Sequence, residues 1–334
     1  MKSPITGKEM KLVREERPMV FRKETFEVVY HSYLCEDSGE QFTTSEMDEL
    51  NLSQLYNKYR DKANIPFPDE IQRIRMMYGL SAVKMSNILG LGDNTYGKYE
   101  SGEMPTVASA RLIQMAADPT RFVKLVELCD SLPPESRIKL LRKIDSLIAE
   151  REHKTVDCLL KGYLLGSHLA DIYSGFRNPS FEKFSEMVVF FAEKVKPFKT
   201  KINKLLFYSD FSSFRKSGFS ISGMRYLAIE RGPVPHNFQG FFEFLQNEHI
   251  IDIENVTFPD GYSGDRIVAR RDRPFNKMLF SSQELAVLNE IVDKLHNTTT
   301  KDIIAMSHRE EGWIQNKDTK GQISYEYAFI LTQV

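Results

Sequence analysis

Hydrophobic and polar positions follow different periods along successive parts of the chain. Residues 1–45 show a roughly two-residue alternation, which predicts β-strands; its apolar members include Phe21, Phe26, Val28, Tyr30 and Tyr33. From Thr44 to Ala63 the apolar positions take helical spacing, and a segment with two prolines, 64–70, predicts a linker. Residues 69–129 predict several short helices separated by breaks that contain glycine or proline.

The remaining pattern predicts a helix at 131–153 and then a third folded unit. The apolar face of that helix is suited to dimerisation, to docking or to packing within the chain. After a mixed apolar stretch, the third unit begins with helices at 181–194 and 198–216 and a strand near 224–230. A tight turn at 231–235, a helix at 236–248 and a β-hairpin follow, and helices at 282–296 and 299–308 come last.

Composition limits the binding functions and the cell compartment that we expect for this chain. The 334 residues carry 45 Lys and Arg against 46 Asp and Glu, so nucleic-acid binding must come from a local patch. The three cysteines, Cys35, Cys129 and Cys158, form no disulfide framework. No apolar run reaches the ~18 residues of a membrane span, and the first residues lack the apolar core of a signal peptide. We therefore expect a cytoplasmic protein without membrane contact.

Residues ~66–118 have the core pattern of a compact helical bundle. Ser81 is a favourable N-cap for a second helix, and Gly90 suits the left-handed residue that ends it. A third helix is predicted from about Asp93. The predicted core consists of Ile71, Ile74, Met85, Ile88, Leu89, Tyr96 and Tyr99, sealed by Leu112 and Met115 of a fourth helix.

This segment resembles the helix-turn-helix of the lambda-repressor-like (XRE) family. The resemblance rests on Tyr99-Glu100-x-Gly102-x-x-Pro105, which follows Leu89-Gly90-Leu91. It implies that the third helix enters the major groove of DNA, where Asn94 and Thr95 would meet bases or phosphate and Lys98 phosphate. The predicted DNA-binding residues are Ser81, Lys84, Asp93, Asn94, Thr95 and Lys98.

Two short turns of similar sequence, residues 3–7 and 35–39, flank the amino-terminal β segment, and each ends in glycine. They resemble the two Cys-x-x-Cys-Gly knuckles of the zinc-binding domain in MqsA-type (YgiT-type) antitoxins, which precedes an XRE-type helix-turn-helix. Here the four ligand positions read Ser3, Thr6, Cys35 and Ser38. Because a structural zinc site needs four N or S donors, we expect no metal and a degenerate zinc-ribbon-like module held by packing.

The third unit contains a series of linked motifs that resembles the Panacea (SocA-like) domain. The motifs are Lys204-Leu205-Leu206-Phe207-Tyr208-x-Asp210, Gly218-x-x-Ile221-x-Gly223, Arg225-Tyr226, Gly232-Pro233-Val234-Pro235, and a closing segment with Ser307-His308, Trp313, Ile323 and Tyr325. The resemblance implies a domain that neutralises diverse toxins.

The residues themselves favour a binding role for this unit. Two prolines and a glycine predict a rigid turn at 232–235, and such a turn loses little entropy when a partner binds. Tyrosine and arginine are frequent interface anchors. The predicted toxin-binding residues are Tyr226, Arg231, Pro233, Pro235, His236, Phe238 and Trp313. For Tyr226, Trp313 and Tyr325, a place in the core is an equally weighted alternative.

Catalysis is the disfavoured interpretation. His236, His249 and His308 are candidate bases or ligands, with Asp210 as a partner, but no metalloprotease, Cys-x-x-Cys, P-loop or nucleophile-elbow pattern occurs. Isolated histidines more often serve structure. We therefore expect neither enzymatic activity nor a cofactor.

These inferences lead to one hypothesis, that of a type II antitoxin. The fold class is multidomain, mainly α with α+β: a β-rich module plus helix at 1–63, a helix-turn-helix domain at 64–130, a helical linker at 131–178 and a Panacea domain at 179–334. Its partners would be a toxin, promoter DNA that it represses and a second copy of itself. A stand-alone regulator whose carboxy-terminal domain senses a ligand, and a protease adaptor, remain alternatives.

Overall fold

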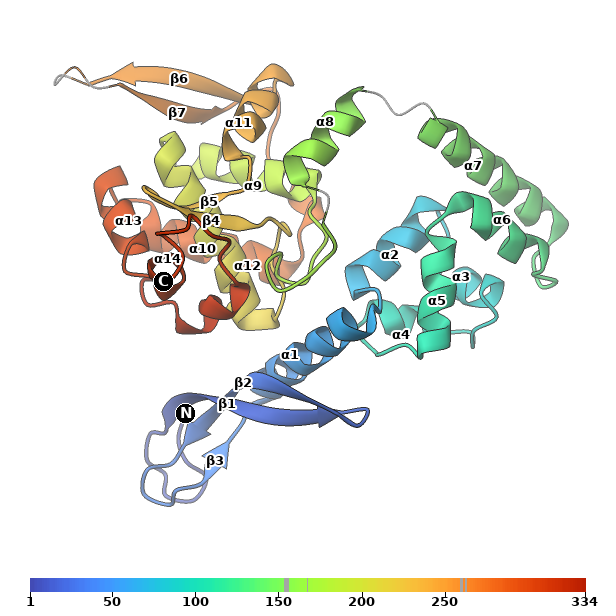
Figure 1. The fold of residues 1–334 in the computed structure, drawn as a ribbon, viewed down its shortest axis with the longest axis horizontal. Helices are drawn as coiled ribbons and strands as arrows, with labels where there is room; N and C mark the ends of the chain where they lie inside the picture. The colour runs from blue at the N-terminus through green and yellow to red at the C-terminus, as the bar shows by residue number, and fades with distance from the viewer. Residues whose placement is uncertain (153–155, 167, 259–260, 262) are drawn as a thin grey trace. The chain divides into compact units, whose positions relative to one another are not determined.

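The computed structural model describes residues 1–152, 156–166, 168–258, 261 and 263–334, with the side chains of residues 151, 152 and 156–158 excepted. The last residue of the helix predicted at 131–153 and the side chain of Cys158 therefore lie outside the described residues. The chain forms two compact units (Figure 1). The smaller unit comprises Pro18–Glu27 and Gln54–Leu160, and the larger unit comprises Met1–Arg17, Val28–Ser53 and Lys161–Val334.

The amino-terminal segment forms a three-stranded sheet followed by one helix. Its strands lie in the order β1-β2-β3, and β2 and β3 are antiparallel. The elements are β1 (Lys11–Phe21), β2 (Glu24–Leu34), β3 (Gln41–Phe42) and α1 (Ser45–Ala63). The predicted change from strands to helix near Thr44 is confirmed.

The smaller unit continues with six helices whose apolar faces share one core. The helices are α2 (Pro68–Met77), α3 (Ala82–Ile88), α4 (Thr95–Glu100), α5 (Val107–Ala116), α6 (Pro119–Glu127) and α7 (Pro134–Glu152). Leu140 and Ile144 of α7 are buried in this core, so α7 packs within the chain, while Ile138 is exposed. The seven core residues predicted in the first three helices are all buried.

The two residues predicted to close this core from the fourth helix, Leu112 and Met115, are wrong by one helical position. Met115 is exposed and Leu112 is only partly buried, whereas Ile113 and Ala116 are fully buried. Helix α5 begins after Thr106, whose side chain accepts a hydrogen bond from the amide of Ser109. That start directs residues 113 and 116 inward, as expected for positions three apart on a helix.

The larger unit is built around one buried helix. It contains α8 (Val156–Leu165, of which residues from Lys161 belong here), α9 (Phe181–Lys194), α10 (Lys199–Ser217), β4 (Tyr226–Ile229), β5 (Gly232–Pro235), α11 (Phe238–Asn247), β6 (Ile251–Thr257), β7 (Ser263–Ala269), η1 (Lys277–Leu279), α12 (Ser282–Leu295), α13 (Thr300–Ser307), α14 (Glu311–Ile314) and η2 (Tyr325–Ile330). Every residue of α10 from Lys201 to Phe214 is buried, because α9, α12, α13, β5, β7 and η2 surround it (Figure 1).

The predicted turn at 231–235 is wrong, because its residues form a strand. Gly232–Pro235 is β5, paired antiparallel with β4, and all four residues are buried. The turn lies one step earlier, at Glu230 and Arg231, and Gly232 follows it with φ +93°. Proline donates no ladder hydrogen bond, so a short edge strand can hold Pro233 and Pro235. Two antiparallel hairpins, β4-β5 and β6-β7, thus accompany the helices.

Taken together, the chain is multidomain and about half helical, with small antiparallel sheets. The predicted fold class is confirmed at that level. No helix of the described residues is long and apolar enough to cross a bilayer.

Candidate functional site

Five of the six predicted DNA-binding residues are exposed. Ser81, Lys84, Asp93, Asn94 and Lys98 lie on the surface, and Thr95 is partly buried. Ser81 caps α3 as predicted by accepting a hydrogen bond from the amide of Lys84 at 3.3 Å, and Gly90 takes the predicted left-handed conformation at φ +66°. These local features place six polar side chains around α3 and α4.

Helices α3 and α4 approach each other closely near these residues. A Cβ added at Gly97 of α4 would lie 3.5 Å from the Cβ of Ala82, in the first turn of α3. The start of α3, with Ser81 and Lys84, therefore adjoins the helix that carries Lys98. The close approach leaves room for a methyl group, so Gly97 is not required by packing.

A partly buried ion pair explains part of the Tyr99–Pro105 motif. The carboxylate of Glu100 accepts hydrogen bonds from Nε and Nη2 of Arg75 at 2.6 and 2.9 Å, and Nη1 of Arg75 donates to the carbonyl of Leu80 at 2.7 Å. This two-point pairing joins α2 to α4 and to the segment before α3. Because its carboxylate pairs with Arg75, Glu100 does not add a second acidic group, besides Asp93, to the exposed surface near α4.

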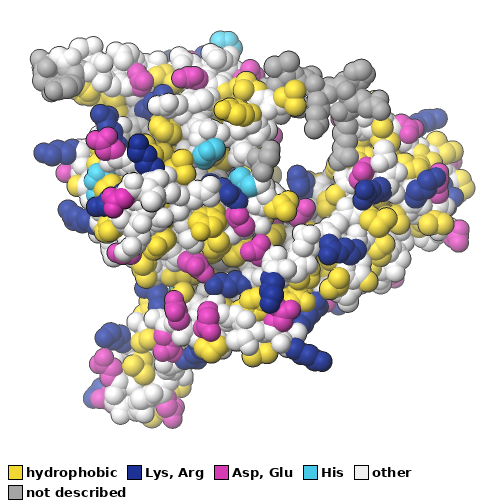
Figure 2. All heavy atoms as spheres, viewed as in Figure 1, with side chains coloured by type: hydrophobic (Ala, Val, Ile, Leu, Met, Phe, Trp, Pro, Cys, Tyr) yellow, Lys and Arg dark blue, Asp and Glu magenta, His cyan; other side chains and the backbone are white. Residues whose placement is uncertain are grey.

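The visible face of the molecule carries no broad field of one charge. In Figure 2, Lys and Arg side chains are interspersed with Asp and Glu over both units. This distribution agrees with the net charge of −1. Electrostatic attraction to a polyanion must therefore come from local clusters.

The two amino-terminal turns have the same backbone form, as predicted. The amide of Gly7 donates to the carbonyl of Ser3 at 2.9 Å, and the amide of Gly39 donates to that of Cys35 at 2.8 Å. The glycines have φ of +71° and +70°. The turns lie together, since Thr6 Oγ1 is 3.4 Å from Cys35 Sγ.

Hydroxyl groups surround the single thiol of this module. Hydrogen bonds from Ser3, Ser38 and Thr6 lower the pKa of Cys35 to about 6. Among the described residues, no group of three or more His, Cys, Asp or Glu side chains is arranged to hold a metal. The four ligand positions of the zinc knuckles are thus brought together here with one sulfur donor.

Asp210 organises the centre of the larger unit. This fully buried carboxylate accepts hydrogen bonds from the amides of Ile221 and Ser222 at 2.8 Å each, from the Ser222 hydroxyl at 2.5 Å and from the Tyr226 hydroxyl at 2.7 Å. Burial raises the pKa of Asp210, while these four donors act in the opposite direction. The pairing of Asp210 with a histidine, considered under the disfavoured catalytic interpretation, is not formed, because hydroxyl and amide donors fill its acceptor sites.

The glycines of this motif allow the loop over Asp210 to pack. Gly218 ends α10 in the left-handed conformation, with φ +77°. Gly223 has φ +74°, and a Cβ there would lie 2.5 Å from the carbonyl oxygen of Asn178. The spacing Gly218-x-x-Ile221-x-Gly223 is therefore explained by chain geometry around a buried carboxylate.

The predicted toxin-binding residues divide into buried and accessible groups. Tyr226, Pro233 and Pro235 are buried, and Tyr226 lies in the core as the alternative interpretation held. Arg231 is exposed, and His236, Phe238 and Trp313 are partly buried. Only the second group can present side chains to a partner.

Trp313 and His308 support the β4-β5 hairpin. The indole of Trp313 donates to the carbonyl of Ile229 at 2.8 Å, and its ring stacks on His308 at 3.9 Å. Burial and the nearby Lys204 lower the pKa of His308. The stacked His308 ring thus lies against Trp313, which is hydrogen-bonded to the hairpin.

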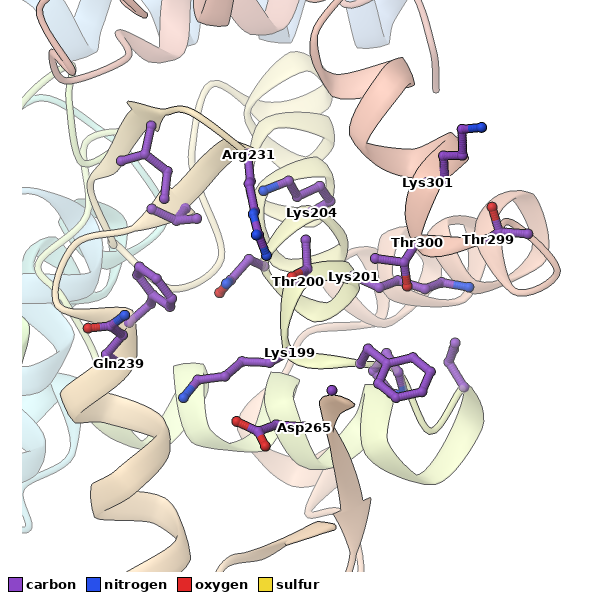
Figure 3. Close-up of a pocket in the computed structure, with 18 of the residues that line it drawn as sticks. Lys199, Thr200, Lys201, Lys204, Arg231, Gln239, Asp265, Thr299, Thr300 and Lys301 are labelled. Carbon is purple, nitrogen blue, oxygen red and sulfur yellow. The ribbon is translucent and has the colours of Figure 1, made fainter. Parts of the chain in front are cut away.

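A basic cavity beside this hairpin was missed by the sequence reasoning. It has a volume of about 1370 Å³ and is lined by residues within 195–204, 229–239, 263–265 and 298–301 together with Asn255, Phe258 and Lys320. Figure 3 shows Arg231 reaching from the β4-β5 turn toward Lys204 of α10. The signal that the sequence offers is a lysine directly before three apolar residues, Lys204-Leu205-Leu206-Phe207.

Comparison with known families finds two matching segments. Residues 202–314 match the family described as "Antitoxin SocA-like, Panacea domain", and residues 1–130 match that of the "Antitoxin component of bacterial toxin-antitoxin system, MqsA". Two segments of the chain are thus similar to antitoxin families of toxin–antitoxin systems. Neither the curated proteins nor the solved structures contain a significant match.

Proposed function

We propose that this protein is a type II antitoxin that binds its toxin through the Panacea domain and represses its own operon through a helix-turn-helix. The observation that carries the proposal is the presence of two antitoxin family segments in one chain, at 1–130 and 202–314. The proposed functional parts are 1–63, 64–130, 131–178 and 179–334. The protein acts by binding rather than by catalysis.

The accessible group at the β4-β5 hairpin supports toxin binding there. Arg231 is exposed at the tip, and Phe238 and His236 follow directly after β5. The Trp313 hydrogen bond and the buried prolines of β5 hold this tip in one conformation. A rigid surface loses little entropy on association, and an arginine beside aromatic rings is typical of interface hot spots.

Variants of this surface test toxin binding. We expect Arg231→Glu and Phe238→Ala each to weaken the complex by about 2 kcal/mol or more, which is the loss typical of an interface anchor. Growth rescue on co-expression with the adjacent gene, and copurification of the two products, provide the measurement. Lys277→Glu is the matched charge-reversal control, because Lys277 is exposed on η1 and lies outside the hairpin. Unimpaired rescue by both hairpin variants would place the toxin elsewhere.

The exposed residues at α3 and α4 support DNA binding. Asn94 and Lys98 lie on the surface of a short helix whose inner side is fixed by Tyr96, Tyr99 and the Arg75–Glu100 pair. Asparagine can pair with a base edge, and lysine can neutralise a phosphate. A dimer would present two such helices to a two-fold operator.

Two substitutions separate base reading from phosphate contact. We expect Asn94→Ala to weaken binding to the protein's own upstream DNA by about 1–3 kcal/mol and to spare non-specific DNA. Lys98→Gln should weaken both and reduce the salt slope by about 1. Fluorescence anisotropy across a salt series measures both effects, with Lys139→Gln on the exposed face of α7 as the control. Equal behaviour of all three variants would contradict this assignment.

A further inference from the structure

The basic cavity beside α10 has a strong excess of positive charge. Seven Lys and Arg residues line it against two acids, Glu230 and Asp265; the seven are Lys196, Lys199, Lys201, Lys204, Arg231, Lys301 and Lys320. Lys201 is already committed, since its ammonium donates to the carbonyls of His296 and Thr298 at 2.8 and 2.6 Å. Asp265 accepts from the Asn255 amide at 3.1 Å. The charge excess is therefore not neutralised within the cavity.

Lys204 is the most unusual of these cations. Its side chain is fully buried, and its ammonium donates to the carbonyl of Pro233 at 3.1 Å. Among the described residues it has no carboxylate partner, although an ammonium has three donors to satisfy. Arg231, which acts electrostatically on Lys204, is also a cation and has no ion-pair partner in the described chain either. An anion between the two would relieve this repulsion.

Two further polar features open onto the same cavity. Helix α10 begins at Lys199, and the side chain of its N-cap, Phe198, accepts no hydrogen bond from the first turn. The first amides of this 19-residue helix are thus available to an anion. Asn203 is 2% exposed, and its side-chain oxygen has no partner in the described structure. Both features are independent of the Lys204–Arg231 pair.

Aromatic side chains line the cavity together with the cations. Phe198, Phe238 and Phe258 are among the lining residues, and the rings of Phe198 and Phe258 lie 5.4 Å apart. The volume of about 1370 Å³ exceeds the roughly 300–1,000 Å³ of common small-molecule pockets, so a ligand of nucleotide size has room. Figure 3 shows Arg231 and Lys204 on the α10 side and Gln239 at the start of α11.

We propose that this cavity binds a nucleotide-class ligand, with its phosphates at Lys204, Arg231 and the start of α10 and its planar ring against the phenylalanines. A cavity lined by both cations and phenylalanines matches a small molecule that carries phosphates and a planar ring. An acidic peptide would use the cations and leave the phenylalanines without a defined role. The cavity shares Arg231 and Phe238 with the proposed toxin surface, so ligand and toxin would meet at the same hairpin.

Isothermal titration of the full chain tests the proposal, with ATP, GTP, tripolyphosphate and a hexaglutamate peptide as probes. We expect saturable binding of a nucleoside triphosphate that exceeds binding of tripolyphosphate and of the peptide. Arg231→Gln and Lys204→Met should each weaken nucleotide binding about tenfold or more, as the loss of a charge-assisted hydrogen bond does. Lys277→Gln, at an exposed lysine outside the cavity, should leave binding unchanged.

Three results would overturn the proposal. The first is the absence of saturable nucleotide binding, and the second is nucleotide binding that both cavity variants leave intact. The third is a preference for hexaglutamate or tripolyphosphate over the nucleotides. Arg231 is exposed, so its variant keeps the fold even if Lys204→Met does not. Neither toxin nor DNA is present in this experiment, so its failure would leave the proposed antitoxin function standing.

Discussion

Replacement of Asp210 by alanine is expected to destabilise the larger unit by about 3–5 kcal/mol. The carboxylate accepts four hydrogen bonds from buried donors, two of them backbone amides of the loop that precedes β4. Each buried donor left without an acceptor costs about 1–3 kcal/mol, and removal of the buried charge offsets part of the sum. Since the free energy of unfolding of an ordinary domain is about 5–15 kcal/mol, this loss removes much of the stability of the unit.

Urea denaturation followed by tryptophan fluorescence measures this effect directly. Trp313 is the only tryptophan, and it lies in the larger unit. The matched control is Ser209→Ala, one position away in α10, because the Ser209 hydroxyl donates only to the carbonyl of Leu205 within the same helix. We expect a change below about 1 kcal/mol for this control. If Asp210→Ala were as stable as the control, Asp210 would not be the organising group.

In contrast to Asp210→Ala, Lys204→Met is expected to raise the free energy of unfolding of the larger unit near neutral pH. Burial, aided by Arg231, lowers the pKa of Lys204 from 10.5 to about 7. At about 1.36 kcal/mol per unit, this shift corresponds to a penalty of roughly 5 kcal/mol below pH 7. The hydrogen bond to the Pro233 carbonyl offsets about 1–1.5 kcal/mol of the gain from removing the charge. The variant should therefore be more stable by roughly 3 kcal/mol at pH 7 or below.

The sign of the pH dependence follows from proton binding. The unfolded chain keeps the Lys204 proton up to about pH 10.5, whereas the folded chain releases it above about pH 7. The unfolded state therefore binds more protons between these values, and the wild-type free energy of unfolding rises with pH relative to the variant. From pH 7 to pH 9 this relative rise is about 2 kcal/mol. The groups that face Lys204 from other elements are Arg231 and His308, and burial and Lys204 itself lower the pKa of His308.

The same fluorescence measurement at pH 7, 8 and 9 checks the prediction. Lys277→Met serves as the control, since an exposed lysine should show no relative pH dependence. Parallel pH curves for wild type and Lys204→Met would mean that Lys204 stays protonated in the folded state. A stabilised, folded variant would also validate its use in the ligand titration.

Helix caps, glycine turns and helix bounds were predictable where they depend on residues that are neighbours in the chain. Ser81 caps α3 because its hydroxyl reaches an amide three residues on, and Gly90 takes a left-handed conformation that other residues avoid. Helix α9 covers the predicted range, Phe181–Lys194, because its apolar positions recur at helical spacing. The paired turns that end at Gly7 and Gly39 were likewise predictable, since in each the glycine follows four residues after the start of the turn.

The wrong predictions concern residues whose burial depends on contacts with other parts of the fold. Periodicity alone placed Leu112 and Met115 inward, but the start of α5 at Val107 turns Ile113 and Ala116 to the core. Two prolines suggested a turn at 232–235, but pairing with β4 makes that segment a strand. Tyr226 looked like an interface residue, yet its hydroxyl is needed by Asp210 inside the domain.

The sequence by itself determined most of the helices and strands, the caps and glycine turns, and the two antitoxin families to which segments of the chain are similar. These depend on contacts among neighbours in the chain or on motifs with fixed spacing. Only the tertiary structure decided that Asp210 meets Ser222 and Tyr226, and that Lys204 lies buried beside Arg231 without a carboxylate. The cavity is lined by described residues of segments that are far apart in the chain. Its charge arises because the fold brings Arg231, Lys301 and Lys320 to the four lysines between residues 196 and 204.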